Sequence, residues 1–295
     1  MNVGLIGLDT SHVPAFAKLI NDPADPHHLP GFRVTVGFPG PPSDFRHSHE
    51  RVGKFTEQVR IEFGVKIVDS AEEVARQADL VLITAVDGRQ HRELFAEIAP
   101  LAKPTFIDKP LATSLADATW IVRTAQQKGI PLMCSSALRY ADNFQQALAG
   151  PKPVVGIDVF GPMTEEVALP GLFWYGVHSV EMVVAAMGAG CRSLRATRTD
   201  STDLICLQYA DGRSAFIRGL RGAHGVFGAS IHRADGVQQV DVNANARPYY
   251  AGLMEAVLTR LAKGQMPVPA EQMLEVVAIM ESANRSRSTG QEVSL

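Results

Sequence analysis

The chain has 295 residues, of which 46% are hydrophobic and 20% charged, with a formal net charge of -3 and a pI near 6.3. These values are typical of a globular protein of about two domains, and they lack the basic footprint of proteins that bind nucleic acids or anionic membranes. We therefore expect a small-molecule ligand, with no nucleic acid and no membrane as partner.

The N-terminus opens directly on an apolar strand pattern, with no basic segment and no long apolar run, so we expect a cytoplasmic protein. The three cysteines are far apart and lack metal-like spacing, and four histidines between residues 27 and 49 have no organised ligands beside them. The sequence therefore predicts neither a disulfide framework nor a metal site.

Residues 3–8 form a short apolar strand that turns into a helix ending near residue 20. A strand, a tight turn and a helix open a nucleotide-binding unit, whose fingerprint Gly-x-Gly-x-x-Gly lets the backbone approach a pyrophosphate at the helix N-terminus. Only Gly7 is present here, because Asp9 and His12 occupy the second and third glycine positions. A carboxylate beside a pyrophosphate costs Coulomb energy unless it turns away or is paired.

Two hydroxyl side chains complete this turn. Thr10 and Ser11 could face a phosphate, or could instead act as N-caps of the helix. The turn as a whole supplies five candidate cofactor contacts, which are Gly7, Asp9, Thr10, Ser11 and His12.

The second predicted strand, residues 32–38, runs into the rigid loop Pro39–Pro42. A site that prefers NAD usually places an acidic residue at this strand end to hold the ribose hydroxyls. The first carboxylate here is Asp44, while Ser43 and Arg46 lie nearby, so the choice between NAD and NADP stays open. We keep Ser43 as a candidate cofactor contact.

A helix over 46–63, a short strand over 66–68 and a capping box beginning at Ser70 lead to a wholly apolar strand over 79–84. Three polar side chains follow that strand just before the next helix, and they are Asp87, Arg89 and His91. The carboxyl ends of parallel strands are where such sheets bind ligands. We expect these side chains to contact the cofactor, and Asp87 and Arg89 could equally contact the substrate.

The next buried strand, residues 105–107, stops at Asp108-Lys109-Pro110. A lysine at this position would lie at the ligand-binding edge of the sheet. The alternative is an ordinary strand exit, with a solvated lysine and a proline that ends the ladder.

A helix over 114–128 and a last strand complete an alternation of strands and helices over residues 1–134, which predicts a doubly wound parallel sheet. From residue 135 onward strands follow one another, with hairpin turns at Asp211-Gly212 and Asp235-Gly236. Residues 135–295 are thus predicted to form an α+β domain with a large, mostly antiparallel open sheet. Its terminal helix could pack back on the first domain.

Six strands and three helices are predicted in this second domain. The strands cover 153–160, 193–199, 203–210, 213–220, 225–232 and 236–242, and the helices cover 176–188, 247–263 and 270–286.

His178 and Glu181 share one face near the N-terminus of the helix 176–188. The helix dipole disfavours imidazolium at that end, which keeps the ring neutral and able to accept a proton. Trp174 and Tyr175 precede the helix and give an aromatic rim suited to a sugar-like ligand. The alternative is a core histidine hydrogen-bonded to Glu181, with the aromatic rings as packing.

Taken together, these landmarks resemble the glucose-fructose oxidoreductase and inositol dehydrogenase family (Gfo/Idh/MocA), and the resemblance covers nearly the whole chain. It rests on the turn at Gly7, the strand end reaching His91, Asp108-Lys109-Pro110, Arg139, the segment 176–181 and the terminal helix with Ser288-Thr289-Gly290. The family's Glu-Lys-Pro has Asp108 in place of Glu. His178 matches the family's histidine in Asp-x-x-x-His, but Trp174 stands where the carboxylate would be.

The resemblance implies a Rossmann-type cofactor domain and an NAD(P)-dependent dehydrogenase or reductase that acts on CH–OH of a sugar, polyol or derivative. His178 would then be the general base, and Lys109 would stabilise developing negative charge on the oxygen. Asp108 would be a cofactor contact. The implied substrate contacts are Arg139, Trp174, Tyr175 and Glu181, and either Glu181 or Tyr175 would replace the missing carboxylate that orients His178.

Two alternatives remain open from the sequence. The first is a glycosidase or lyase that oxidises its sugar transiently, with no net redox change. The second is a sugar-binding or regulatory protein that has lost the cofactor, because the turn at Asp9 and His12 is altered. In each case we expect a homodimer or homotetramer that associates through the exposed face of the second-domain sheet.

Overall fold

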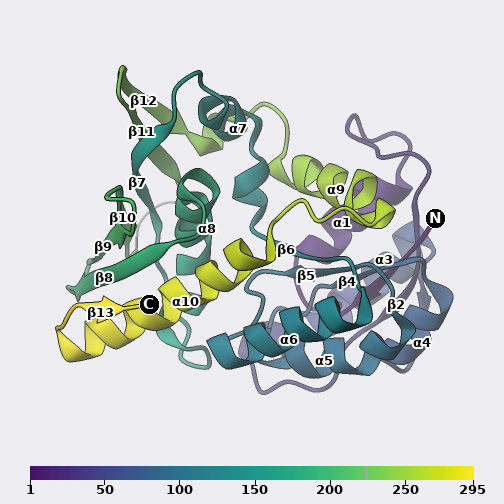
Figure 1. Cartoon of the computed structure of the whole chain (residues 1–295). Helices are drawn as coiled ribbons and strands as arrows, with labels where there is room; N and C mark the ends of the chain where they lie inside the picture. Colours follow the sequence, from purple (N-terminus) through teal and green to yellow (C-terminus); the bar gives the residue numbers. More distant parts are fainter. Residues whose placement is uncertain (223–224) are drawn as a thin grey trace. The chain divides into compact units, whose positions relative to one another are not determined.

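The computed structural model describes residues 1–222 and 225–295 of the chain (Figure 1). The chain divides into two compact units. Unit 1 comprises Met1–Ala112, Ala116–Ser135 and Tyr250–Pro269, and unit 2 comprises Thr113–Leu115, Ser136–Tyr249 and Ala270–Leu295.

Unit 1 is built on six parallel strands, namely β1 (Asn2–Ile6), β2 (Arg33–Phe38), β3 (Lys66–Ile67), β4 (Leu80–Ile83), β5 (Thr105–Asp108) and β6 (Leu132–Ser135). The order across the sheet is β3-β2-β1-β4-β5-β6. Every residue of β4 and β5 is buried, as strands covered on both faces require. The prediction of a doubly wound parallel sheet is confirmed. In this sheet the strand order changes direction between β1 and β4, and such sheets bind dinucleotides at that point.

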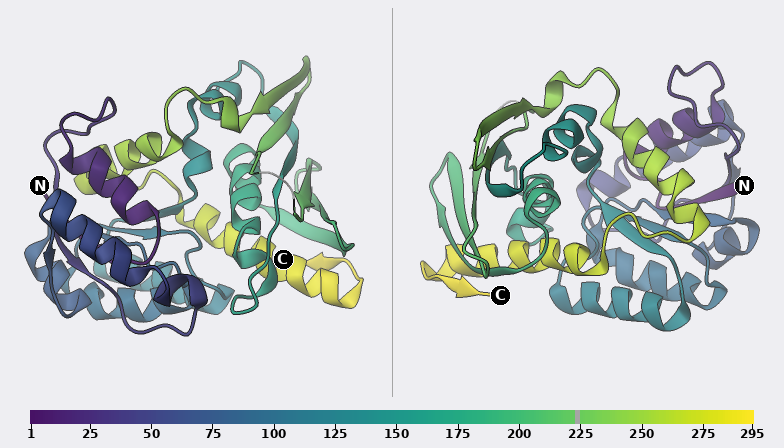
Figure 2. Two further views of the ribbon diagram at one scale, coloured as in Figure 1. Left: turned by 180° about the vertical axis from the view of Figure 1, so that it is seen from behind. Right: turned by 45° about the horizontal axis from the view of Figure 1, so that its top comes forward.

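Helices cover both faces of this sheet. The α-helices of this part of the chain are α1 (His12–Asn21), α2 (Arg46–His49), α3 (Val52–Phe63), α4 (Ala71–Gln77), α5 (His91–Ile98), α6 (Leu115–Lys128) and α9 (Tyr249–Thr259). Helix α1 packs with α3 on one face, and α4 packs with α5 on the other (Figures 1 and 2). Helix α1 buries a stripe that includes Val13, Phe16 and Ile20, whose spacing matches the helical period.

The prediction of one helix over 46–63 is wrong, because α2 and α3 are separate helices with Glu50 and Arg51 between them. The Ser48 hydroxyl of α2 donates a hydrogen bond of 2.5 Å to the buried Asp9 carboxylate. We attribute the break to this contact, which directs α2 toward the turn after β1. A local helical pattern cannot reveal such a tertiary contact.

Unit 2 contains a seven-stranded sheet. Its strands are β7 (Val154–Pro162), β8 (Cys191–Arg198), β9 (Thr202–Tyr209), β10 (Ser214–Leu220), β11 (Gly228–Arg233), β12 (Gly236–Asp241) and β13 (Val293–Ser294). The order is β12-β11-β7-β10-β9-β8-β13, and every neighbouring pair is antiparallel except β7 and β10. The mostly antiparallel sheet is therefore confirmed, as are the hairpins at Asp211-Gly212 and Asp235-Gly236.

The helices of unit 2 are α7 (Asp142–Leu148), α8 (Gly176–Met187) and α10 (Ala270–Thr289). Helices α8 and α10 pack against one face of the sheet (Figures 1 and 2). The short elements α7 and β13 were not predicted from the sequence.

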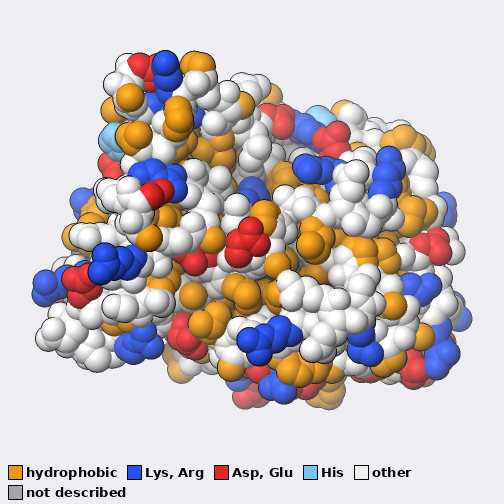
Figure 3. Space-filling model, in the orientation of Figure 1, with side chains coloured by type: hydrophobic (Ala, Val, Ile, Leu, Met, Phe, Trp, Pro, Cys, Tyr) orange, Lys and Arg blue, Asp and Glu red, His pale blue; other side chains and the backbone are white. Residues whose placement is uncertain are grey.

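On the surface that Figure 3 shows, acidic and basic side chains are interspersed. Within the described residues, no helix is both long enough and apolar enough to cross a membrane.

Candidate active site

Gly7 shapes the turn after β1. Its backbone has φ +86°, and its N–H donates a hydrogen bond of 2.9 Å to the carbonyl of Phe38 at the end of β2. A Cβ at this position would lie 2.4 Å from the backbone of Ala85, which follows β4. Only glycine allows three strand ends to approach so closely.

Asp9, at the second glycine position of the fingerprint, turns inward. One carboxylate oxygen accepts the Ser48 hydroxyl, and the other accepts the Val86 N–H at 2.8 Å. Burial raises the pKa of Asp9, while these two donors oppose the rise. Because both oxygens accept hydrogen bonds inside the unit, this carboxylate does not point toward an anion bound at the turn.

His12, at the third glycine position, pairs with the Asp108 carboxylate. Its Nδ1 lies 2.5 Å from Oδ2 of Asp108, and both side chains are largely buried. The other oxygen of Asp108 accepts the backbone N–H of Lys109 at 2.9 Å. The aspartate of Asp108-Lys109-Pro110 therefore ties the end of β5 to the start of α1.

The pKa of Asp108 reflects this pairing. Burial by itself would raise the pKa of Asp108. The effects of His12 and Lys109 outweigh burial and lower the pKa to about 2.

We expect Asp108 to make the stability of the protein depend on pH in the acid range. Because its folded pKa is depressed, the ionised carboxylate contributes stability that is complete above the unfolded value near 3.8 and is lost as the pH falls toward about 2. The contribution is about 2 kcal/mol. Urea unfolding of the parent and Asp108→Asn between these limits measures it. An equal loss of stability in both proteins would contradict the assignment.

A charged cluster lies where β2 and β4 end. The Arg89 guanidinium donates two hydrogen bonds to Asp87, at 2.8 and 2.9 Å, and one to Asp44 at 2.5 Å. The Ser43 hydroxyl donates to Asp87 at 2.8 Å. Burial would raise the pKa of Asp87, but the bonds from Arg89 and Ser43 hold it below its usual value. The positive charge of Arg89 is thus already matched by two carboxylates.

A cavity of about 440 Å³ adjoins this cluster at the end of β2. Its lining combines prolines and apolar groups with one arginine and two glutamates, and consists of Phe38, Pro41, Pro42, Arg89, Gln90, Glu93, Leu94 and Glu97.

His91 is fully buried. Its Nδ1 lies 2.8 Å from the carbonyl of Pro110 and its Nε2 lies 2.8 Å from the carbonyl of Ala85. Both nitrogens therefore face backbone acceptors, and the ring joins the loop after β4 to the loop after β5.

The side chains of Thr10 and Ser11 differ in exposure. Thr10 is buried and its hydroxyl oxygen accepts the N–H of His12 at 3.4 Å, whereas Ser11 is exposed and makes no side-chain cap. Gly7 allows a ligand to approach the backbone closely, Asp9 turns inward, and α1 starts at the turn. The turn as a whole therefore fits a dinucleotide pyrophosphate.

In unit 2, His178 is half-buried and its Nδ1 lies 2.7 Å from the hydroxyl of Ser136. Ser136 follows directly after β6, and its Oγ also accepts the N–H of Leu138 at 3.3 Å. A serine hydroxyl thus holds the imidazole, where the family pattern would use a carboxylate. The sequence analysis missed Ser136, because nothing in the local pattern distinguishes it from an ordinary strand-end serine.

Aromatic rings surround His178 within the same unit. The Tyr175 ring centroid lies 5.7 Å from that of His178, and the Phe227 centroid lies at 5.5 Å on an edge contact. Trp174 stacks edgewise on Tyr175 at 6.0 Å. Trp174, Tyr175 and His178 are all partly exposed, so these side chains can meet a ligand.

Arg139 and Glu181 form a buried ion pair. Nε of Arg139 donates to Glu181 at 2.6 Å, and Nη1 donates to Gln272 at 2.9 Å. The remaining nitrogen, Nη2, is buried without a hydrogen-bond partner in the described part of the chain. This pair links the start of unit 2 to α8. Arg139 and Glu181 were both predicted as substrate contacts, and in the structure they bind each other.

Removing one partner of this pair is expected to destabilise the fold strongly. Glu181→Leu leaves the Arg139 guanidinium buried and unpaired, and the cost should be about 3 to 5 kcal/mol in unfolding free energy. The double variant Arg139→Met with Glu181→Leu should recover most of the loss, since both charges are then gone. Urea unfolding of Glu181→Leu, of Arg139→Met and of the double variant measures the coupling. Additive losses would show that the two side chains do not act as a pair.

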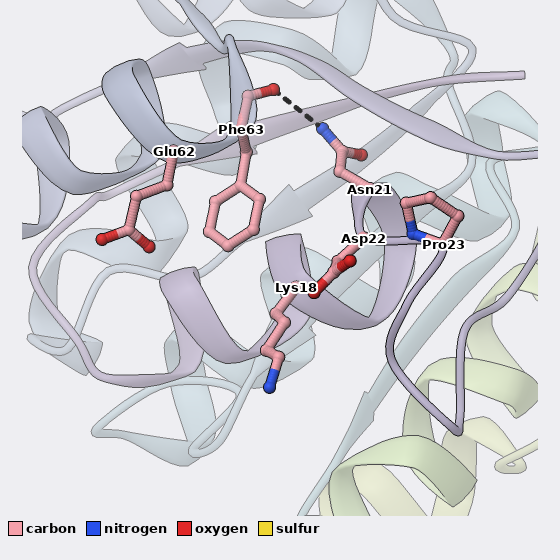
Figure 4. A pocket seen from close by; sticks show the side chains of 6 residues that line it. All are labelled: Lys18, Asn21, Asp22, Pro23, Glu62 and Phe63. Carbon is pink, nitrogen blue, oxygen red and sulfur yellow. Dashed lines mark hydrogen bonds between the residues drawn. The ribbon is translucent and has the colours of Figure 1, made fainter.

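Another cavity, of about 460 Å³, lies at the carboxyl ends of α1 and α3 (Figure 4). Asn21 on its wall donates to the carbonyls of Val34 and Phe63, at 2.9 and 3.2 Å. The cavity therefore lies at the opposite end of α1 from the turn at Gly7 and includes no predicted site residue. In the part of the chain that the structure describes, no three His, Cys, Asp or Glu side chains gather to hold a metal ion.

Comparison with known families supports the resemblance suggested by the sequence. Residues 47–136 match the family model GFO_IDH_MocA, described as an oxidoreductase family with an NAD-binding Rossmann fold. The predicted resemblance is confirmed for this segment. No curated protein sequence matches the chain.

Solved structures with the same fold align with all or nearly all of this chain. GenD2 from gentamicin A biosynthesis, in complex with NAD, has 17% identity and a TM-score of 0.78, with 100% of this chain and 96% of that chain covered. Scyllo-inositol dehydrogenase from Lactobacillus casei, with bound NAD(H) and scyllo-inositol, has 12% identity, a TM-score of 0.80 and coverages of 100% and 98%. UDP-N-acetylglucosamine 3-dehydrogenase GnnA from Acidithiobacillus ferrooxidans has 14% identity, a TM-score of 0.79 and coverages of 97% and 97%. At these identities the likeness establishes the fold.

Proposed function

From the match of residues 47–136 to the Gfo/Idh/MocA oxidoreductases, we propose that this chain is an NAD-dependent dehydrogenase or reductase of a sugar, polyol or derivative. The proposal rests above all on Lys109, which stands at the carboxyl end of β5, in the matched segment and at the ligand-binding edge of the sheet. The bound nicotinamide would supply the hydride acceptor or donor.

Each candidate residue has a distinct role in this proposal. Lys109 would polarise the substrate oxygen and stabilise the negative charge that develops on it. His178 would accept the hydroxyl proton at Nε2, which requires that Nδ1 carries the hydrogen and donates it to the Ser136 oxygen. This bond would set the ring orientation. Trp174 and Tyr175 would present aromatic surfaces to the apolar faces of a cyclic substrate.

The charges at the end of β2 support NAD over NADP. An NADP site needs a cation available for the 2′-phosphate. Arg89 is bound by Asp87 and Asp44, and the adjoining cavity carries Glu93 and Glu97. Like charges would oppose a phosphate there. We expect NADH to bind at least about tenfold more tightly than NADPH, because close like charges cost several kcal/mol.

Calorimetric titration with NADH and NADPH, followed by an absorbance screen of inositols, hexoses and amino sugars, tests the proposed activity. Binding of NADH and a substrate-dependent change in its absorbance are the expected results. The absence of any dinucleotide binding would refute the proposal. Consumption of a sugar without net change in NADH would instead identify an enzyme that oxidises its substrate transiently.

We further propose that the chain self-associates through the open face of the unit 2 sheet. Helices α8 and α10 cover one face, whereas Phe160, Cys206 and Arg218 are exposed on strands of the same sheet. A sheet face that no helix of its own unit covers is a surface on which a second copy can pack about a two-fold axis. Light scattering of the parent and of Phe160→Arg would test the proposal, and a monomeric parent would refute it.

A further inference from the structure

The aromatic residues beside His178 follow directly after a short helical turn. Residues 163–175 join β7 to α8, and they form a single 3-10 turn at Gly171–Phe173. The side chains of Leu172 and Phe173 are buried, whereas Trp174 and Tyr175 are partly exposed. The positions of the two exposed rings therefore depend on how this turn is held.

Asn284 of α10 binds the turn through both ends of its amide. Its Oδ1 accepts the N–H of Leu172 at 3.2 Å, and its Nδ2 donates to the carbonyl of Pro170 at 3.1 Å. An asparagine amide offers both an acceptor and a donor group, so it can bind a backbone N–H and a backbone carbonyl at once. The N–H of Phe173 also donates to the Pro170 carbonyl, at 3.1 Å. One side chain of α10 thus fixes the entry to the turn and the turn itself.

Gly171 shows how closely the turn and α10 approach each other. Its φ is +43°, and a Cβ at this position would lie 2.4 Å from Oδ1 of Asn284 and 2.8 Å from Nη2 of Arg287. A left-handed φ favours glycine, and the space beside it admits no side chain. Any larger residue at 171 would push the turn away from Asn284.

Arg287 holds the beginning of the same segment. It lies three residues after Asn284, on the same face of α10. Its guanidinium donates to Glu165 at 2.5 Å and to the fully buried Asp203 of β9 at 3.0 Å. A change at Arg287 would weaken the pairing of a buried charge, and the resulting loss of stability would obscure any local effect. Asn284 is uncharged and half-buried, so it can be changed without that loss.

Ring contacts extend from the turn to His178. Trp174 packs edgewise on Tyr175 at 6.0 Å, and Tyr175 packs edgewise on His178 at 5.7 Å. The imidazole has a second attachment, because its Nδ1 is hydrogen-bonded to Ser136. A displaced turn would therefore move the two exposed rings more than it moves the proposed base.

We propose that Asn284 is the positioning residue of the aromatic pair Trp174 and Tyr175, and that it thereby sets the affinity of the site for a cyclic substrate. This inference rests on the proposed function and deepens it. The two rings would contact a face of the substrate that does not react. Such contacts are equal in the ground state and the transition state, so they affect KM rather than the turnover number.

Steady-state kinetics with the cyclic sugar or inositol found in the absorbance screen tests this role. Asn284→Leu removes both hydrogen bonds to the turn. We expect KM to rise by roughly tenfold, the worth of one or two hydrogen bonds, while the turnover number changes by less than about threefold. The control Arg285→Gln changes the exposed neighbour, which donates to the Ser294 carbonyl, and should follow the parent. An unchanged KM, or a fall in turnover as large as the rise in KM, would overturn the proposal.

Trp174 itself reports on the position of the turn. The chain contains two tryptophans, so Trp120→Phe leaves Trp174 as the single indole. In that background, acrylamide should quench the Trp174 fluorescence more strongly in Asn284→Leu than in the parent. Gly171→Ala should have the same effect, because its Cβ would displace Oδ1 of Asn284, and it decides the question if Asn284→Leu fails to fold. The two substitutions together should raise KM no further than the larger single effect, since both break the same contact. Equal quenching in the parent and in both variants would refute the role of Asn284.

The fluorescence measurement needs neither cofactor nor substrate, and this separates the inference from the proposed function. If no form of the chain binds NADH or NADPH, the dehydrogenase proposal fails, while stronger quenching in Asn284→Leu still supports Asn284 as the residue that positions Trp174. If the parent turns over NADH and KM is the same in Asn284→Leu, the dehydrogenase proposal stands and the role of Asn284 in substrate binding is refuted.

Discussion

Replacing Lys109 by methionine is expected to lower the turnover number by roughly 10²- to 10⁴-fold, the usual worth of a positioned charged or proton-transferring group. Methionine keeps much of the length of the lysine side chain but removes the ammonium that would stabilise charge on the substrate oxygen. Because Lys109 connects to Asp108 through its backbone N–H, the substitution leaves that hydrogen bond in place. Steady-state absorbance of NADH, with the substrate identified in the screen, measures the loss.

Two further variants show whether the loss in Lys109→Met comes from the missing ammonium group. Lys109→Arg keeps the positive charge but spreads it over a planar group, so we expect partial activity only. Lys128→Met changes an exposed lysine at the end of α6 and should retain the parent rate. Calorimetry should show that Lys109→Met still binds NADH. A turnover number close to that of the parent in Lys109→Met would exclude a catalytic role for the lysine.

Replacing His178 by alanine is expected to have a comparable effect, a loss of roughly 10²- to 10⁴-fold in turnover, because the proposed general base is removed. His178 is half-buried and borders Tyr175 and Phe227, so the loss of the ring should also weaken substrate binding. Turnover and KM are therefore to be measured together. A change confined to KM would identify His178 as a binding residue only.

Ser136 tests how the imidazole is oriented. Ser136→Ala removes the hydroxyl 2.7 Å from Nδ1, and we expect about a tenfold loss in turnover, less than for removal of the base itself. Ser136→Asp introduces a carboxylate that favours imidazolium, so the pH profile of turnover should move to higher pH. His232→Gln changes a partly exposed histidine on β11 and serves as the control. Unchanged turnover and pH profiles in both Ser136 variants would show that the hydroxyl does not orient the base.

Much of the fold follows from local pattern. The wholly apolar run that forms β4 and the period of α1 report burial directly, and Asp-Gly dipeptides mark the two hairpins of unit 2. The break between α2 and α3 and the two-residue strand β13 were not predictable in this way. Their existence depends on contacts with distant segments, namely the approach of Ser48 to Asp9 and the pairing of β13 with β8.

The candidate site divides along the same line. Lys109 and the motif around it could be proposed as site residues from the sequence, because they are consecutive residues at a predicted strand end. The partner of His178 was not, and the expected substitutes, Glu181 and Tyr175, have other contacts in the structure. Glu181 pairs with Arg139, Tyr175 contacts the imidazole through its ring, and the Ser136 hydroxyl is hydrogen-bonded to Nδ1.

By itself, the sequence determined most of the order of strands and helices, the two kinds of sheet and the strand ends that carry polar side chains, because these depend on periodicity and on residue types at neighbouring positions. Only the tertiary structure decided which side chains meet. His12 and Asp108 are 96 positions apart, Ser136 and His178 are 42 apart, and Asp9 and Ser48 are 39 apart. Such pairs form when packed elements bring separate turns together, and no local pattern encodes that geometry.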